Sequence, residues 1–172
     1  MCPTSTLKET IELGKFYSLA DEAILFQIHD AFEPELDRLK TAYAIQEPGT
    51  PTNSTDSVCE AESPSQLLYG EDHDEVNRTL VGVLALRWIM NNEYEKFVAN
   101  QPEAVRLHRD SFNWLRKLFI KGLRTPSDLF ALIMAMIIND LGKDLNLEDD
   151  YFTKTQKSVK GMNHDRILFE AA

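Results

Sequence analysis

Cysteine, glycine and long apolar runs are all scarce in this 172-residue sequence, which has two cysteines and seven glycines. Cys2 and Cys59 form neither a disulfide framework nor the paired spacing of a zinc ribbon. The apolar run at residues 129–138 is far shorter than the roughly 20 residues of a membrane span. Residues 1–10 lack the apolar segment of a secretory signal. We therefore expect a cytoplasmic protein without a membrane partner.

Positive charge is also in deficit, because 18 lysines and arginines face 28 acidic residues, for a formal net charge of −10. An acidic surface repels phosphate backbones, so we expect no nucleic-acid partner. One basic group stands out, and the solvated face of a helix explains it without any ligand. Its members are Arg106, Arg109, Arg116, Lys117, Lys121 and Arg124.

Several catalytic signatures are missing. The sequence has no glycine-rich phosphate loop, no nucleophile elbow, no His-Glu-x-x-His and no Cys-x-x-Cys. Whether the chain is an enzyme therefore stays open at this level.

Helical periodicity is abundant. Residues 18–46 carry apolar side chains at helical spacing, and Pro34 predicts a kink or break near Phe32. Residues 126–141 are apolar on nearly all sides, as in a buried helix, and Thr125 with Asp128 forms a capping signal at their start. No segment alternates with the period of two that a half-buried strand requires. We predict an all-α fold, an irregular helical bundle, with further helices at residues 74–90, 102–121, 146–156 and 166–172.

The distribution of turn formers predicts three parts. Residues 1–46 form an N-terminal helical segment. Residues 47–73 are rich in proline, serine, asparagine and glycine, which is typical of a flexible linker. Residues 74–172 form the main helical body.

The end of the most apolar helix carries a polar pair, Asn139 and Asp140, followed by Gly142 and Lys143. A carboxylate at a helix C-terminus is disfavoured by the helix dipole and by desolvation, so a nearby cation is expected to offset it. Lys143 is the simple candidate, and a metal ion is the other. The plain interpretation is a helix that ends at a glycine stop.

These residues resemble a known signature. Ile137-Ile138-Asn139-Asp140-Leu141-Gly142-Lys143 is similar to the hydrophobic-hydrophobic-His-Asp-hydrophobic-Gly-Lys motif of the HD-domain superfamily of metal-dependent phosphohydrolases. His108 precedes Asp140 as that family's first histidine does, and His164 lies where a later histidine opens a helix. The resemblance implies an HD-domain-like C-terminal half. It also implies that His108, Asp140 and His164 bind a divalent transition metal (Mn, Fe, Co or Zn), with Asp140 and Lys143 as catalytic residues.

The sequence departs from that family at two points. Asn139 stands where the family has a metal-binding histidine, and no residue corresponds to the family's last aspartate. The segment Asn139–Asp144, followed by Asn163–Asp165, also resembles a group of fungal proteins without an assigned reaction. The plain interpretations are a hydrogen-bonded His108 on a helix face and a helix start at His164.

Two functions follow. The first is a divergent HD-like protein that binds a metal or a phosphorylated small molecule, with hydrolase activity as the alternative to simple binding. The second, which we favour for this chain, is a non-catalytic helical protein that acts by association with a protein partner or as a homodimer. An exposed apolar patch of several hundred Å² would mark the second function.

Overall fold

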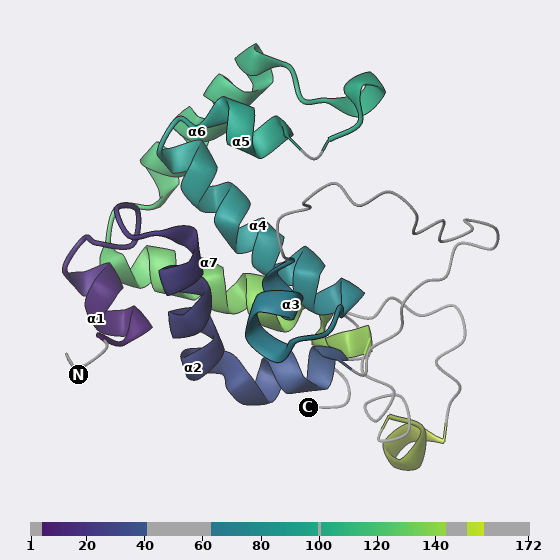
Figure 1. Cartoon of the computed structure of the whole chain (residues 1–172). Coiled ribbons are helices and arrows are strands. Elements are labelled where there is room, and N and C mark those ends of the chain that lie inside the picture. Colours follow the sequence, from purple (N-terminus) through teal and green to yellow (C-terminus); the bar gives the residue numbers. More distant parts are fainter. Residues whose placement is uncertain (1–4, 41–62, 100, 144–150, 157–172) are drawn as a thin grey trace.

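The computed structural model describes residues 5–40, 63–99, 101–143 and 151–156. Every regular element in these ranges is a helix, so the expected all-α class is confirmed (Figure 1). In chain order the labelled elements are α1 (Leu7–Glu12), α2 (Asp21–Lys40), α3 (Pro64–Tyr69), α4 (Asp74–Met90), α5 (Tyr94–Val98), η1 (Glu103–Val105), α6 (Arg109–Gly122), α7 (Pro126–Asn139) and η2 (Asp140–Lys143). Residues 151–155 are also helical, within the helix predicted at residues 146–156, of which residues 146–150 lie outside the described ranges.

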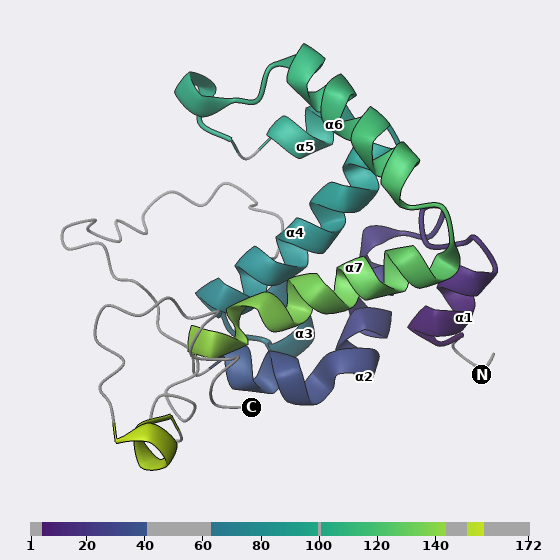
Figure 2. The ribbon, with the colours of Figure 1, turned by 180° about the vertical axis from the view of Figure 1, so that it is seen from behind.

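The hydrophobic core lies where α1, α2, α4 and α7 meet. Figures 1 and 2 show α4 crossing the centre of the molecule, with α2 on one side and α7 on the other. Ile28 of α2, Leu80 of α4 and Ile133 of α7 are fully buried in one contiguous cluster. Burial of each such side chain contributes about 1.5–3 kcal/mol, so this crossing dominates the stability of the fold.

Helix α2 is kinked as the sequence predicts. Phe32 has non-helical φ and ψ angles of −134° and 29°, two residues before Pro34. Proline lacks the amide hydrogen of a regular helix and clashes with the preceding turn, which explains the position of the kink. The Phe32 ring is buried and stacks on Phe130 of α7, with centroids 6.1 Å apart.

The predicted division of the chain is wrong in one respect. Helix α3 falls inside the stretch expected to be a linker, because Ser63 and Gln66 form a capping box and Pro64 occupies the first helical turn. Leu67 and Leu68 of α3 pack against the core formed by α2 and α4. Residues 47–62 of the predicted linker lie outside the described residues. The expected N-terminal segment and the helical body thus share one core.

The helix expected at residues 102–121 begins later, at Arg109, where α6 starts. The preceding stretch is held in place by two hydrogen bonds at Leu107, whose amide donates to Gln101 Oε1 at 2.9 Å and whose carbonyl accepts from Tyr94 Oη at 2.7 Å. Helix α7 starts as predicted, with a capping box between Thr125 and Asp128. In the described ranges, no helix has the length and apolar character for a membrane crossing.

Candidate functional site

His108 serves as the N-terminal cap of α6. Its Nδ1 accepts a hydrogen bond from the amide of Asp110 at 3.2 Å, and its side chain is 76% exposed. The first amides of a helix lack partners within the helix, so a capping side chain satisfies one of them. This contact accounts for the position of His108 without a metal.

Asp140 lies directly after α7, at the first residue of η2. It is half-buried and accepts a hydrogen bond from Asn139 Nδ2 at 3.4 Å. A cavity of about 300 Å³ opens beside it, between α4 and α7. The cavity is also lined by Arg78, Thr79, Gly82, Ala135 and Met136.

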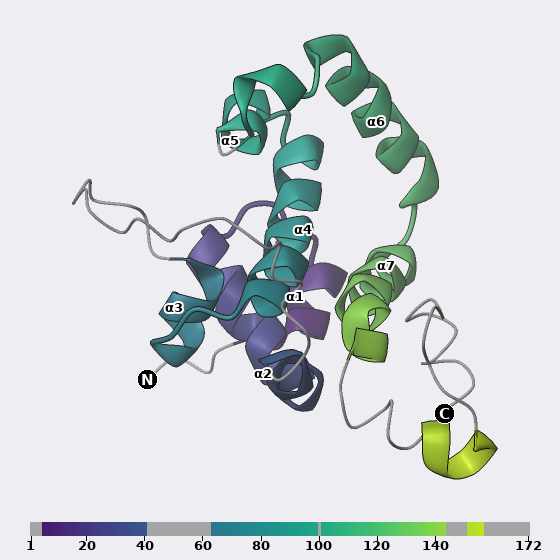
Figure 3. The same ribbon diagram turned by 90° about the vertical axis from the view of Figure 1, so that its right-hand side faces the viewer.

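The residues expected to share a metal are not brought together in the described part of the chain. His108 begins α6 and Asp140 ends α7, and the ribbon views place these two ends well apart (Figures 1, 2 and 3). Among the described residues, no group of three or more His, Cys, Asp or Glu side chains is arranged to hold a metal ion. His164 and the side chain of Lys143 lie outside those residues. The metal site and the catalytic roles of Asp140 and Lys143 therefore stay predictions.

The core contains a polar cluster that the sequence reasoning missed. Arg87 of α4 is only 2% exposed, and its Nη1 lies 2.6 Å from Asp21 Oδ1 while its Nη2 donates to the carbonyl of Leu19. Trp88 Nε1 donates to the other oxygen of Asp21 at 2.9 Å. Burial lowers the pKa of Arg87, and the carboxylate of Asp21 opposes this change. Both oxygens of Asp21 are engaged, so the cluster joins α2 to α4 and leaves the carboxylate little freedom for chemistry.

The inner side of α6 is fixed by three contacts. Phe112, fully buried, packs against the rings of Tyr94 and Phe97, with centroids 5.2 Å and 5.4 Å away. Arg116 Nε donates to the carbonyl of Met90 at the end of α4 at 3.1 Å. Arg109 pairs with Glu95 at 2.5 Å. These contacts determine which side of α6 faces outward.

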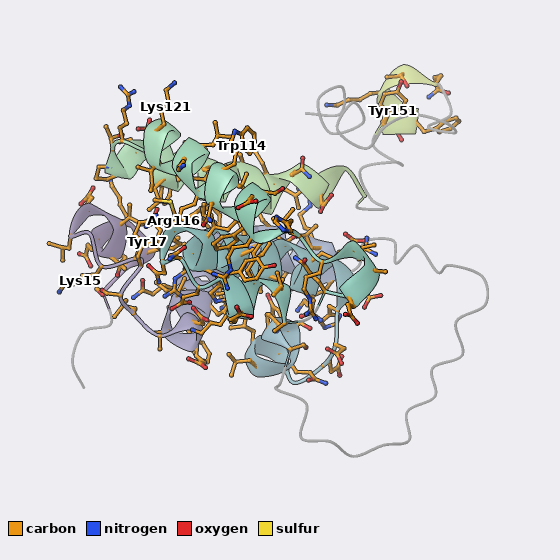
Figure 4. All side chains as sticks on the ribbon, turned by 90° about the horizontal axis from the view of Figure 1, so that it is seen from above. Lys15, Tyr17, Trp114, Arg116, Lys121 and Tyr151 are labelled. Carbon is orange, nitrogen blue, oxygen red and sulfur yellow. The ribbon has the colours of Figure 1, made fainter. Side chains whose placement is uncertain are left out.

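The outward side of α6 carries apolar and charged groups together. At about 100° per residue, five side chains fall between about 140° and 240° from Phe112 around the helix. They are Asp110, Trp114, Lys117, Leu118 and Lys121, and we call them the α6 face. Trp114 is 64% exposed and Leu118 50% exposed. Figure 4 shows Trp114 and Lys121 along the outer edge of α6.

Helix α7, which follows α6 in the chain, also carries exposed apolar side chains. Figures 2 and 3 show α6 and α7 joined by a short turn and lying on one side of α4. Met134 and Ile138 of α7 are exposed, as are Ala131 and Ala135. Exposed apolar side chains thus occur on both α6 and α7. From the sequence, Lys117 and Lys121 were grouped with a solvated basic helix face, and Trp114 was not recognised as part of it.

A profile of a family of unknown function, DUF6829, matches residues 25–172. The chain belongs to the DUF6829 family. Searches of curated proteins and of solved structures found no match. The DUF6829 match covers all of α4, α6 and α7, so both the cavity beside Asp140 and the α6 face lie within the family region. Helix α1 precedes that region.

Proposed function

We propose that this chain acts without catalysis, by association, and that the α6 face is its binding surface. The observation that carries the proposal is the exposure of Trp114 and Leu118, four residues apart on one side of a helix whose other side is fixed. Tryptophan contributes strongly at protein interfaces because it buries a large rigid surface at low entropic cost. A large exposed apolar pair on the side of α6 that faces away from its contacts with α4 and α5 therefore favours a binding role.

The charge distribution supports the same role. Residues 106–124 contain six basic residues and one acidic residue, a net +5, so the remainder of the chain carries −15. Lys117 and Lys121 take part in no ion pair within the described ranges. Charges of one sign on a surface of the opposite sign steer a partner to a defined place. Lys117 and Lys121 therefore help to orient a partner that makes the apolar contact with Trp114.

The cavity beside Asp140 favours a second candidate function, the binding of a small ligand. Thr79 is buried, and its Oγ1 has no hydrogen-bond partner among the described residues although it lines the cavity. An unsatisfied buried hydroxyl costs free energy, which a bound polar group would recover. Titration with inorganic phosphate, followed by the amide signals of Thr79 and Asp140 in NMR spectra, tests it. Saturable shifts that Thr79→Val removes support this function, and unchanged spectra reject it.

The association function is tested by placing a photo-cross-linking phenylalanine derivative at Leu118 in cells. The matched control carries it at Phe26 of α2, which has nearly the same exposure, 47% against 50%. We expect a discrete covalent adduct from position 118 and none from position 26. Equal labelling at both positions, or none at 118, would reject the α6 face as a binding surface.

A further inference from the structure

The charges on the α6 face indicate what binds there, on the condition that the chain acts by association as proposed above. We infer that the partner is a second copy of this chain, bound so that the two α6 helices lie antiparallel. The inference rests on the order of the residues along the face. Asp110 stands at the N-terminal end, Trp114 and Leu118 occupy the middle, and Lys121 stands at the C-terminal end.

This order is self-complementary in the antiparallel arrangement. If Trp114 lies opposite Leu118 of the second copy, the symmetry axis crosses the helix at position 116. Asp110 then faces Lys121 of the second copy, because the midpoint between positions 110 and 121 lies within half a residue of position 116. One register therefore satisfies the apolar pair and the charged pair together, each of them twice, as a two-fold interface requires.

Electrostatics select antiparallel over parallel pairing. A parallel pair would place Asp110 against Asp110 and Lys121 against Lys121, which is repulsive at both ends. The antiparallel pair places opposite charges together and also opposes the two helix dipoles. Asp110 is accessible for this contact, since its side chain is 90% exposed and, among the described residues, pairs with His108 Nδ1 alone, at 3.5 Å.

The neighbouring positions allow close approach. Ser111 lies opposite Gly122 of the second copy in the same register, since their midpoint is also within one residue of position 116. A Cβ atom added at Gly122 would meet nothing within 4 Å in the single chain. The space beside this glycine is therefore open to another helix.

Two features limit the strength of the dimer. Lys117 lies near the symmetry axis, so the two copies bring like charges together at the centre. Helix α6 is also only about 21 Å long at 1.5 Å per residue, which is less than a standard interface of about 800 Å² per partner needs. We expect a dissociation constant on the order of micromolar.

Sedimentation equilibrium of the full chain tests the inference through a charge exchange. Asp110→Lys and Lys121→Asp should each weaken dimerisation about tenfold, because each replaces two attractive pairs with two repulsive ones. The double variant D110K/K121D restores the opposite charges and should return to near the wild-type constant. A monomeric wild type, or a double variant as weak as the single ones, overturns the inference.

Two further variants do not depend on disrupting α6. Lys117→Ala removes the like charges at the axis and should tighten the dimer. Gly122→Gln should weaken it while leaving the thermal midpoint of the monomer unchanged, because the added side chain enters open space. A weaker dimer for Lys117→Ala together with a tighter dimer for Gly122→Gln would contradict the antiparallel register.

The mass of the cross-linked adduct at position 118 separates this inference from the proposed function. An adduct of twice the chain mass supports both. An adduct with another protein supports association and rejects the second copy as partner. The absence of any adduct rejects association itself.

Discussion

Two regions of this chain use apolar residues in opposite ways. In the crossing of α2, α4 and α7, side chains such as Ile28, Leu80 and Ile133 are fully buried. In α6, only Phe112 is buried, and Trp114 and Leu118 stand exposed beside lysines. Burial in the crossing stabilises the folded chain, whereas the exposed side chains of α6 leave apolar surface for binding. The same residue type therefore has different consequences in the two regions, and matched substitutions can separate them.

The largest difference is expected between two leucines. Leu80→Ala removes a fully buried side chain and should lower the free energy of unfolding by about 2–5 kcal/mol. Leu118→Ala, on the half-exposed face, should change it by less than about 0.5 kcal/mol. Urea unfolding at a concentration where the chain is monomeric measures both. Similar losses for the two variants would show that α6 is part of the folding core.

The polar cluster of the core is expected to come next. Asp21→Ala leaves the guanidinium of Arg87 buried without its carboxylate, which should cost about 3 kcal/mol. The double variant D21A/R87M should be less destabilised than D21A, because the buried charge is gone. Urea unfolding midpoints compare the two. Equal stability of wild type and D21A would mean that this ion pair does not join α2 to α4.

A smaller effect is expected at the start of α6. His108→Ala removes the N-terminal cap and should lower the free energy of unfolding by about 0.5–1 kcal/mol, whereas His108→Asn keeps a capping side chain and should be nearly neutral. Elemental analysis of the purified variants provides the control. If the wild type contains a stoichiometric transition metal and the His108→Asn variant does not, His108 is a metal ligand, as the resemblance implies.

The smallest effect is expected from pH at the start of α7. Hydrogen bonds from Thr125 and Arg124 hold the pKa of Asp128 below its ordinary value. A carboxylate with a lowered folded-state pKa stabilises the fold at neutral pH, and this stabilisation is lost as pH falls through that pKa. The difference in thermal midpoint between wild type and Asp128→Asn should therefore shrink toward acid pH. A difference that stays constant would exclude a role of the charge.

Local signals in the sequence were sufficient for much of the fold. The kink near Phe32 follows from Pro34, and the start of α7 follows from Thr125, Pro126 and Asp128, because the causes lie within a few residues. The start of α6 was misplaced, since contacts of Gln101 and Tyr94 with Leu107 hold the preceding segment outside the helix. Such contacts depend on tertiary packing and cannot be seen in the spacing of apolar residues along the sequence.

The candidate site was less accessible to sequence reasoning. Periodicity shows that α6 has an apolar side, but it does not show that Phe112 rather than Trp114 faces inward. That choice is made by Tyr94, Phe97 and the carbonyl of Met90. Likewise, the resemblance suggested His108 and Asp140 as partners from their order in the chain, while the angle between α6 and α7 holds them apart.

The two tryptophans of the chain provide the most direct test, because one lies in each region. Trp88 donates to Asp21 beside the core, and Trp114 stands on the α6 face. In a protein labelled with 5-fluorotryptophan, the fluorine NMR signal of Trp114 should shift with protein concentration while that of Trp88 stays constant. Signals that are both constant from about 1 μM to 1 mM, a range that spans the expected dissociation constant, would contradict self-association through α6.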